Sequence, residues 1–244
     1  MIFRRLFQGV AAALLLAGLA VKSPGASAVI EGQQLVRQMR DMRPANSFTN
    51  TGVLEIRRDA RHRVPVYLKT IVVGEHWHNV YGTATSQTLV ISHSHDGPNV
   101  YRSLPPTSIN ANPEFLNQRA LNSSLVPFAG SDFWLFDLGL EFLQWPVQRV
   151  TGSGIKKAQK CHVLESVNPF PRRGAYSRVV SWVDKDSMAI VTAEAYDYQG
   201  RLWKRFEPKS LMKVDGKYRL REIVMWDLRA DSKTTLTFDR ELEK

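Results

Sequence analysis

The feature that most constrains the fold is a two-residue alternation of apolar and polar side chains, which begins near Thr51 and continues almost to the C-terminus. Runs of this kind are rich in β-branched and aromatic residues and favour half-buried strands. They occupy residues 53–73, 76–83, 88–94, 99–104, 160–166, 176–184, 189–197, 201–214, 218–229 and 233–239. Turn-forming pairs such as Gln199-Gly200 and Asp215-Gly216 supply tight connections. The pattern predicts a long antiparallel meander, and the chain shows no internal repeat or low-complexity linker that would divide it.

Residues 30–42 change to a helical period. Leu35, Val36, Met39 and Met42 fall on one apolar stripe, whereas the charged side chains of the segment point away from it. Pro44 follows and ends the helix. We therefore expect an amphipathic helix ahead of the sheet.

A second helix is predicted over residues 131–145, within "GSDFWLFDLGLEFLQWP". Ser131 can cap this helix and Pro146 stops it. Asp137, Glu141 and Gln144 form a narrow polar strip that we expect to be solvated, and apolar side chains cover well over half of the circumference. Such a helix is either a central core helix or one with an apolar side that faces a ligand. Residues 104–128, before it, are polar and contain prolines, so they are predicted to form an extended crossing loop.

The N-terminus has the organisation of an export signal. Arg4 and Arg5 form a basic start, residues 10–21 are apolar but too short to span a bilayer, and Ala26-Ser27-Ala28 is a small-x-small processing site. We predict that residues 1–28 are a cleaved signal peptide and that residues 29–244 form a single exported domain. The only cysteine, Cys161, cannot form an internal disulfide, and we expect an inert, mostly buried thiol.

The mature chain is basic. The leader carries Arg4, Arg5 and Lys22 and no acidic residue, so its removal lowers the formal net charge from +10 to +7. For an exported protein this charge favours anionic lipid head groups or cell-envelope polymers over nucleic acid as partners. The basic residues crowded on one hairpin, which could meet an anionic membrane surface or simply be an exposed face, are Arg57, Arg58, Arg61 and Arg63.

Several segments together resemble the LolA-like outer-membrane lipoprotein-sorting family. They are "GSDFWLFDLGLEFLQWP" at 130–146, "CHVLESVNP" at 161–169, "YSRVVSWVDKDS" at 176–187, "AEAYDYQGRLWKRFEP" at 193–208 and "MWDLRADSKTTLTFD" at 225–239. The order of these motifs carries the resemblance, which covers most of residues 30–240 and is strongest after residue 128.

The resemblance implies an α+β, mainly β fold, in which a strongly curved antiparallel sheet forms an incomplete β-barrel and helices close its concave apolar face. It also implies a periplasmic carrier of lipid or lipoprotein acyl chains, without catalytic residues, metal or other cofactors. On the matched helix, Phe133, Trp134, Leu138 and Phe142 are the expected cavity contacts. Acyl binding would be driven by the burial of methylene groups, each of which contributes about 0.8 kcal/mol of binding free energy.

Four histidines are the competing chemical signal. His76 and His78 alternate along one predicted strand, and His93 and His95 along the next. A hairpin that turns near Thr85-Ser86 would place His76 opposite His95 and His78 opposite His93, as zinc or copper ligands of a metal-dependent enzyme. Asp96-Gly97 directly after them is an ordinary turn pair, and the spacing lacks the ligand pattern of metallo-hydrolases. We therefore favour solvent-facing histidines.

The sequence thus favours an exported carrier of a hydrophobic ligand, with residues 131–145 as a lid over the sheet. The alternatives are a metal-dependent enzyme that uses the histidine hairpin, and an envelope sensor module with the same fold that binds a partner protein.

Overall fold

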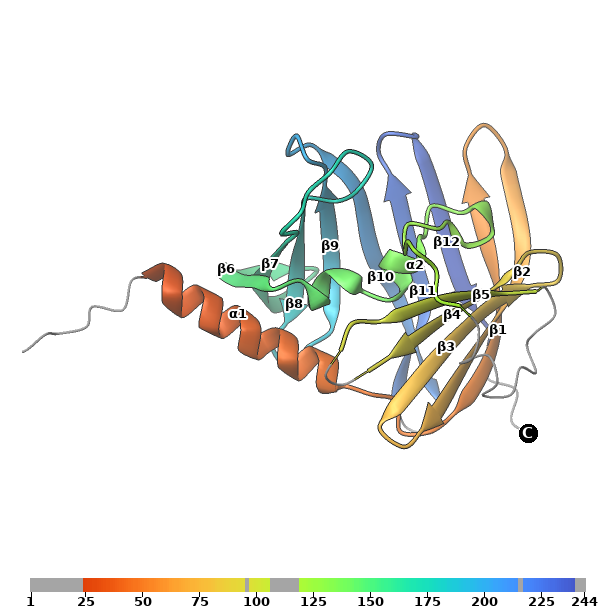
Figure 1. Ribbon diagram of the computed structural model, residues 1–244, viewed down its shortest axis with the longest axis horizontal. Coiled ribbons are helices and arrows are strands. Elements are labelled where there is room, and N and C mark those ends of the chain that lie inside the picture. The colour runs from red at the N-terminus through yellow and green to blue at the C-terminus, as the bar shows by residue number, and fades with distance from the viewer. Residues whose placement is uncertain (1–23, 95–96, 106–118, 215–216, 240–244) are drawn as a thin grey trace, which may run out of the picture.

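The computed structural model describes residues 24–94, 97–105, 119–214 and 217–239, and within them one antiparallel sheet of twelve strands dominates (Figure 1). The strands are β1 (Phe48–Arg57), β2 (Arg61–Val73), β3 (His76–Thr83), β4 (Thr88–His93), β5 (Val100–Leu104), β6 (Val147–Lys156), β7 (Gln159–Val167), β8 (Arg178–Asp184), β9 (Ile190–Tyr196), β10 (Leu202–Val214), β11 (Lys217–Asp227) and β12 (Ser232–Phe238). The predicted meander is confirmed, including the hairpin that carries Arg57 to Arg63, with one difference: β6 was not predicted.

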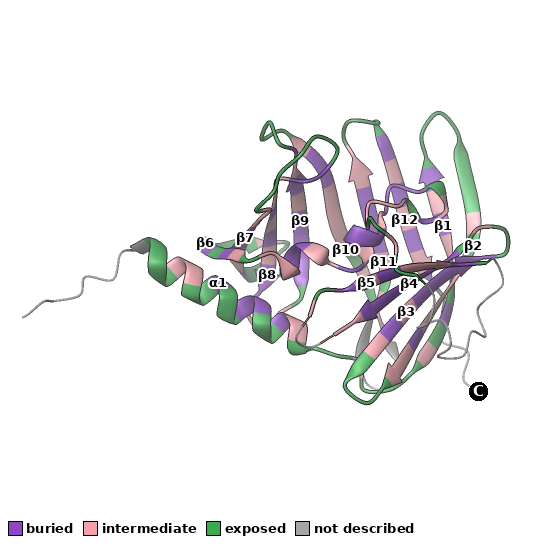
Figure 2. Ribbon diagram, in the orientation of Figure 1, coloured by how far each residue is buried: buried purple, intermediate pink, exposed green. Residues whose placement is uncertain are grey.

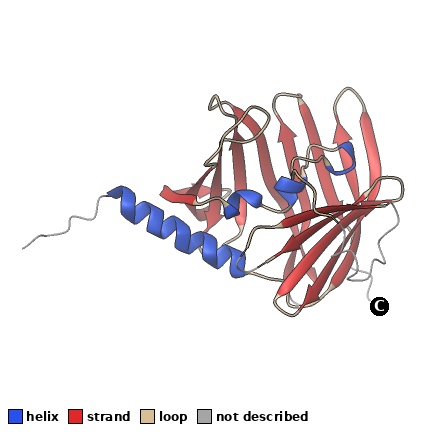
Figure 3. Ribbon diagram, in the orientation of Figure 1, coloured by secondary structure: helices blue, strands red, loops and turns tan. Residues whose placement is uncertain are grey.

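The sheet is open. Its strand order is β5-β4-β3-β2-β1-β12-β11-β10-β9-β8-β7-β6, so β5 and β6 are the two edges. At its centre the first and last strands pair, with Leu54 opposite Leu236. The sheet curves strongly around one face, which the connection between its edges crosses (Figures 1 and 3). The predicted fold class, a mainly β incomplete barrel, is confirmed.

The part of the crossing connection that the structure describes, residues 119–146, contains three short helical turns rather than one helix. They are η3 (Phe128–Gly130), α2 (Leu135–Leu138) and η4 (Glu141–Gln144). The expected continuous helix over residues 131–145 is wrong, because Leu140 adopts a left-handed conformation with φ of 47° and separates α2 from η4. Gly139 before it permits a close approach, since a Cβ there would lie 2.7 Å from the Tyr101 hydroxyl. Ser131 does not cap α2, but its hydroxyl accepts a hydrogen bond from the Phe133 amide at 3.2 Å.

Helix α1 (Pro24–Asp41) packs along the β6 edge of the sheet. It begins earlier than the predicted residue 30, and Leu35, Val36 and Met39 are buried as expected, whereas Met42 follows the helix and is exposed. Gly32 allows the contact, because a Cβ there would lie 2.6 Å from the backbone nitrogen of Arg149. Much of the helix surface is exposed (Figure 2). The helix thereby covers part of an edge strand that would otherwise offer unpaired backbone groups.

Among the described helices, none combines the length and the apolar character needed to cross a bilayer. Residues 1–23 of the predicted leader lie outside the described residues, and the cleavage after Ala28 stays a prediction. Residues 106–118 of the predicted crossing loop at 104–128 also lie outside the described residues, so the conformation of that part stays a prediction.

Candidate functional site

The site is the concave face of the sheet together with the segment that covers it, residues 124–145, which we call the lid. Its side chains fill two apolar clusters on the sheet. Phe128, Phe133 and Leu135 pack with β1–β5, β11 and β12, and Phe136, Phe142 and Leu143 pack with α1 and β6–β10. The lid therefore supplies the centre of both halves of the core (Figure 2).

The four predicted cavity residues are divided between these halves. Phe133 is fully buried in the first cluster, and Leu138 packs against its rim. Phe142 is buried in the second cluster, and Trp134 packs against it while stacking on Tyr176 with ring centroids 5.2 Å apart. The structure thus places all four on the lid but does not bring them together on one surface. Their contact with a ligand stays a prediction.

Sequence reasoning missed other lid residues of equal burial. They are Phe128, Leu135, Phe136 and Leu143. The four residues were predicted on the matched helix, whereas Phe128 lies in the predicted crossing loop before it. For Leu135 and Phe136, the signal that could have found them is the unbroken apolar character of residues 133–136, which fits no single helix face.

A buried lysine on the sheet contacts the middle of the lid. Lys204 on β10 is only 1 % exposed, and its Nζ donates a hydrogen bond to the backbone carbonyl of Asp132 at 2.7 Å. The same Nζ lies 3.4 Å from the centroid of the Trp134 ring and 3.7 Å from Asp137 Oδ2. Lys204 therefore contacts the lid through a carbonyl, an aromatic face and a carboxylate at once.

Asp137 completes this contact. Its Oδ2 accepts a hydrogen bond from the Trp134 amide at 2.9 Å, and its Oδ1 accepts one from the Tyr176 hydroxyl at 3.0 Å. The expectation that Asp137 is solvated is wrong, because its carboxylate accepts from the amide at the start of α2 and faces Tyr176 and Lys204, where it is buried. Burial raises the pKa of Asp137, and burial lowers the pKa of Lys204. Desolvation thus opposes this ion pair, which needs its hydrogen bonds to persist.

Asp132 fixes the start of the lid to the sheet. Its carboxylate accepts hydrogen bonds from Ser232 at 2.6 Å and Thr234 at 2.7 Å, both on β12. Arg58 lies 3.3 Å from the same carboxylate at its exposed side. Two buried aspartates therefore attach the lid, one to the sheet centre and one to β10.

The lid is attached to the sheet mainly through side chains. Its backbone-to-backbone hydrogen bonds are internal: the Leu135 amide donates to Val126, the Phe136 amide to Ser124 and the Phe128 amide to Phe133. Among the described residues, no backbone-to-backbone hydrogen bond joins residues 124–145 to a strand. The lid can therefore leave the concave face without breaking the sheet ladder.

Little space remains between the lid and β8–β11. The gap bounded by Asp137, Phe142, Lys204 and Phe206 has a volume of about 20 Å³, enough for roughly one water molecule. An acyl chain would fit this gap only if the lid moved.

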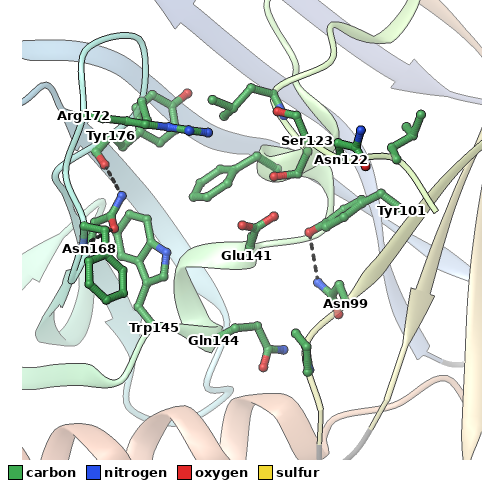
Figure 4. Close-up of a pocket in the computed structure, with 17 residues that line it drawn as sticks. Asn99, Tyr101, Asn122, Ser123, Glu141, Gln144, Trp145, Asn168, Arg172 and Tyr176 are labelled. Atoms are coloured by element: carbon green, nitrogen blue, oxygen red, sulfur yellow. Dashed lines mark hydrogen bonds between the residues drawn. The ribbon is translucent and has the colours of Figure 1, made fainter.

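Two larger cavities adjoin the lid. One of about 250 Å³ lies between the lid and β3–β4, where Leu138, Trp77 and His93 line it. The other, on the outer side of the lid, is open and has a volume of about 540 Å³ (Figure 4).

The strand register separates the histidines. His93 pairs with Trp77 and stacks on its ring at 4.8 Å, while His78 pairs with Ser92. The predicted pairing of His78 with His93 is wrong, since the hairpin turns at a different position and places these two side chains on opposite faces. His76 shares the face of His78, and His95 lies outside the described residues. The expectation of solvent-facing histidines holds for the exposed His76 but is wrong for His78, which is only 5% exposed and whose pKa burial lowers. No group of three or more metal-ligating side chains occurs in the described residues.

Cys161 does not contribute to this site, whereas the basic hairpin contacts the lid through Arg58. Cys161 is a free, buried cysteine, as expected, and burial raises the pKa of its thiol. On the basic hairpin, Arg57 and Arg61 lie 2.8 Å and 3.6 Å from the Glu55 carboxylate. Arg58 faces Asp132. The hairpin's role at a membrane stays a prediction.

A family model described as "Uncharacterized protein" matches residues 117–241, just over half of the chain. The chain belongs to this family. No curated protein sequence gives a significant match to it.

Three solved structures share its architecture. A DUF1329 family protein from Desulfovibrio piger superposes with a TM-score of 0.71 at 18% identity, covering 88% of this chain and 92% of that one. A domain assigned to the outer membrane lipoprotein-sorting proteins, from Vibrio parahaemolyticus, gives 0.68 at 18% identity, covering 88% and 95%. A LolA superfamily protein from Nitrosomonas europaea gives 0.54 at 16% identity, covering 87% and 94%. The chain has a LolA-like fold.

The LolA-like fold confirms the resemblance inferred from the motif order. It accounts for the curved sheet and the covered concave face. At these identities the similarity concerns architecture, and the ligand has to be argued from the site itself.

Proposed function

We propose that this protein is an exported periplasmic carrier that holds the acyl chains of a lipid or a lipoprotein between the lid and the concave face of the sheet. The observation that carries the proposal is the lid itself. Its side chains fill both apolar clusters on the concave face, yet among the described residues no backbone-to-backbone hydrogen bond joins residues 124–145 to a strand. The assignment of the Vibrio parahaemolyticus relative to lipoprotein sorting supports the same function.

Exchange of lid side chains for acyl chains is energetically plausible. When the lid lifts, inner-face residues such as Leu54, Leu164 and Val179 lose apolar contacts. An acyl chain in the same place would restore these contacts at about 0.8 kcal/mol for each buried methylene. The polar contacts of Asp132 and Asp137 must be released at the same time, so they set the free energy of opening.

Native mass spectrometry tests the proposal. Residues 29–244, exported and purified without detergent, should carry lipid or take it up from vesicles at a defined stoichiometry. Phe142→Gln, with its polar group in the second cluster, should retain less lipid. Leu211→Gln, a change at an exposed position on β10, should retain lipid as the wild type does. A folded wild-type protein that neither carries nor takes up lipid would overturn the carrier function and favour the partner-binding module.

A further inference from the structure

The open cavity of about 540 Å³ on the outer side of the lid has a polar floor and aromatic walls (Figure 4). It lies between η4, the start of β5 and the loop between β7 and β8. Phe136, Trp145 and Tyr176 line it, and Tyr176 also bounds the small gap beneath the lid. The cavity is thus separated from the proposed acyl site by only one layer of side chains.

One buried acceptor in this cavity, Glu141 Oε2, lacks a hydrogen-bond partner among the described residues. Asn99 beside it is buried, and its Nδ2 donates to the Gly139 carbonyl at 2.8 Å and lies 3.3 Å from the Tyr101 hydroxyl. A side-chain hydrogen bond with His93 engages the Asn99 side chain as well, but an amide oxygen can accept a second hydrogen bond. The Glu141 oxygen is therefore the free group. A buried acceptor without a donor is costly, which points to a ligand that supplies donors.

The donor should be a cation. Glu141 projects into the middle of the cavity, with Tyr101 and Asn99 on one side and Trp145 on the other (Figure 4). Burial and the nearby Glu141 carboxylate raise the pKa of the Tyr101 hydroxyl, so Tyr101 stays protonated and its hydroxyl donates toward Glu141, which leaves the other carboxylate oxygen for a ligand. A carboxylate, an amide oxygen and aromatic faces together suit an alkylammonium group. Calcium, which takes six to eight oxygen ligands, finds too few here.

An anion site adjoins the cation site. Arg172 lies across the cavity from Asn99 (Figure 4). Within the described part of the chain its guanidinium makes no ion pair. A free arginine at the rim is suited to a phosphate, which it can bind with two hydrogen bonds. The cavity therefore offers a cation site and an anion site within one open space.

We propose that this cavity binds the zwitterionic head group of an ethanolamine phospholipid, with the ammonium on Glu141 and Asn99 and the phosphate on Arg172. The inference rests on the proposed carrier function, because the acyl chains of the same lipid would enter under the lid beside Tyr176. The head-group site would select ethanolamine phospholipids as cargo, whereas the apolar interior alone does not distinguish lipids with the same acyl chains.

Competition between two lipids with identical chains tests the head-group site. The protein is incubated with vesicles of dioleoyl phosphatidylethanolamine and dioleoyl phosphatidylglycerol in equal amounts, and the bound lipids are counted by native mass spectrometry. We expect roughly a tenfold preference for the ethanolamine lipid, the size of one charge-assisted hydrogen bond. Glu141→Gln should reduce the preference to near unity, while Glu75→Gln, at an exposed position in the β2–β3 turn, should leave it unchanged.

The outcomes separate the two proposals. Equal uptake of both lipids by the wild type would overturn the head-group site and leave the carrier function standing. Uptake of neither lipid would overturn both. A preference that survives in Glu141→Gln would overturn the role of Glu141 and would mean that ordered water alone satisfies its carboxylate. If Glu141→Gln does not fold, Arg172→Gln at the rim replaces it, with an expected loss of about tenfold in affinity for the ethanolamine lipid. Unchanged affinity in that variant would overturn the phosphate site.

Discussion

Lys204 is a charged residue on the inner face of an otherwise apolar sheet. Its neighbour on that face, Phe206, contacts both apolar clusters. A lysine at such a position is retained only with partners, and the lid brings all of them: the Asp132 carbonyl, the Trp134 ring and the Asp137 carboxylate. The alternation of Lys204 and Phe206 was visible in the sequence. The role of Lys204 could not be predicted, because its partners come from a segment about 70 residues away. The backbone path of that segment does not follow from its composition.

We predict that Lys204→Met destabilises the protein strongly. Methionine fits the space but leaves Asp137 buried without a cation, and loss of one partner of a buried pair costs about 3–5 kcal/mol. Urea unfolding measures the change. Lys209→Met on the same strand is the matched control, since Lys209 pairs with Glu207 at the surface and should contribute less than about 1 kcal/mol. Similar losses in the two variants would contradict the anchoring role of Lys204.

His93 predicts a dependence of stability on pH. Burial lowers its pKa from 6.5 to about 4 in the folded protein. Because the folded-state pKa is depressed, the unfolded chain binds the proton more readily. The contribution of His93 is therefore complete above pH 6.5 and is lost as the pH falls toward 4.

His93→Gln should flatten this dependence. Between pH 7 and pH 4.5 the wild type should lose about 2 kcal/mol more unfolding free energy than the variant. The measurement is urea unfolding at the two pH values. His62→Gln, at an exposed position on the basic hairpin, serves as the control and should behave as the wild type. Parallel pH curves for wild type and His93→Gln would show that His93 titrates normally.

Helix α1 depends on one glycine for its position. Gly32 faces the backbone of Gln148 and Arg149, and a Cβ would approach the Gln148 carbonyl carbon to 2.6 Å. The neighbouring stripe of Leu35, Val36 and Met39 belongs to the second apolar cluster. Displacement of the helix by an added methyl group would therefore disturb that cluster.

We predict that Gly32→Ala destabilises the protein although alanine is the better helix former by about 1 kcal/mol. Overpacking against a backbone that cannot yield should cost about 1–3 kcal/mol. Thermal unfolding followed by circular dichroism measures the net effect. Gln34→Ala, at an exposed position of the same helix, should be neutral or slightly stabilising. A stabilised Gly32→Ala would show that α1 is free to move away from β6.

The lid shows where prediction of elements reaches its limit. The composition of residues 131–145 correctly indicated a segment with two apolar sides to bury, since it packs into two clusters. Its conformation did not follow, because every residue but Gly139 tolerates a helix and the break at Leu140 is imposed by packing on the sheet. Strand β6 was missed for the opposite reason: Gly152, Ser153 and Gly154 weaken a strand pattern that pairing with β7 nevertheless enforces.

At the scale of the whole molecule, the architecture was the most predictable property. Period-two alternation and turn pairs require an antiparallel meander, and the resemblance added its curvature. The path of the lid also follows from this topology, because β5 and β6 are the opposite edges of the sheet and are joined by residues 105–146. Alternation alone could not decide which strands meet at the centre, since any apolar-faced pair would satisfy the pattern.

The pairing of β1 with β12 has a consequence for how such a chain comes to be folded. Synthesis delivers the N-terminus first, so β12, residues 232–238, arrives after both of the strands that it joins. Until then β1 and β11 are open edges of two separate half-sheets, and such edges can recruit strands from other molecules. The arrival of β12 therefore converts two aggregation-prone half-sheets into one continuous sheet.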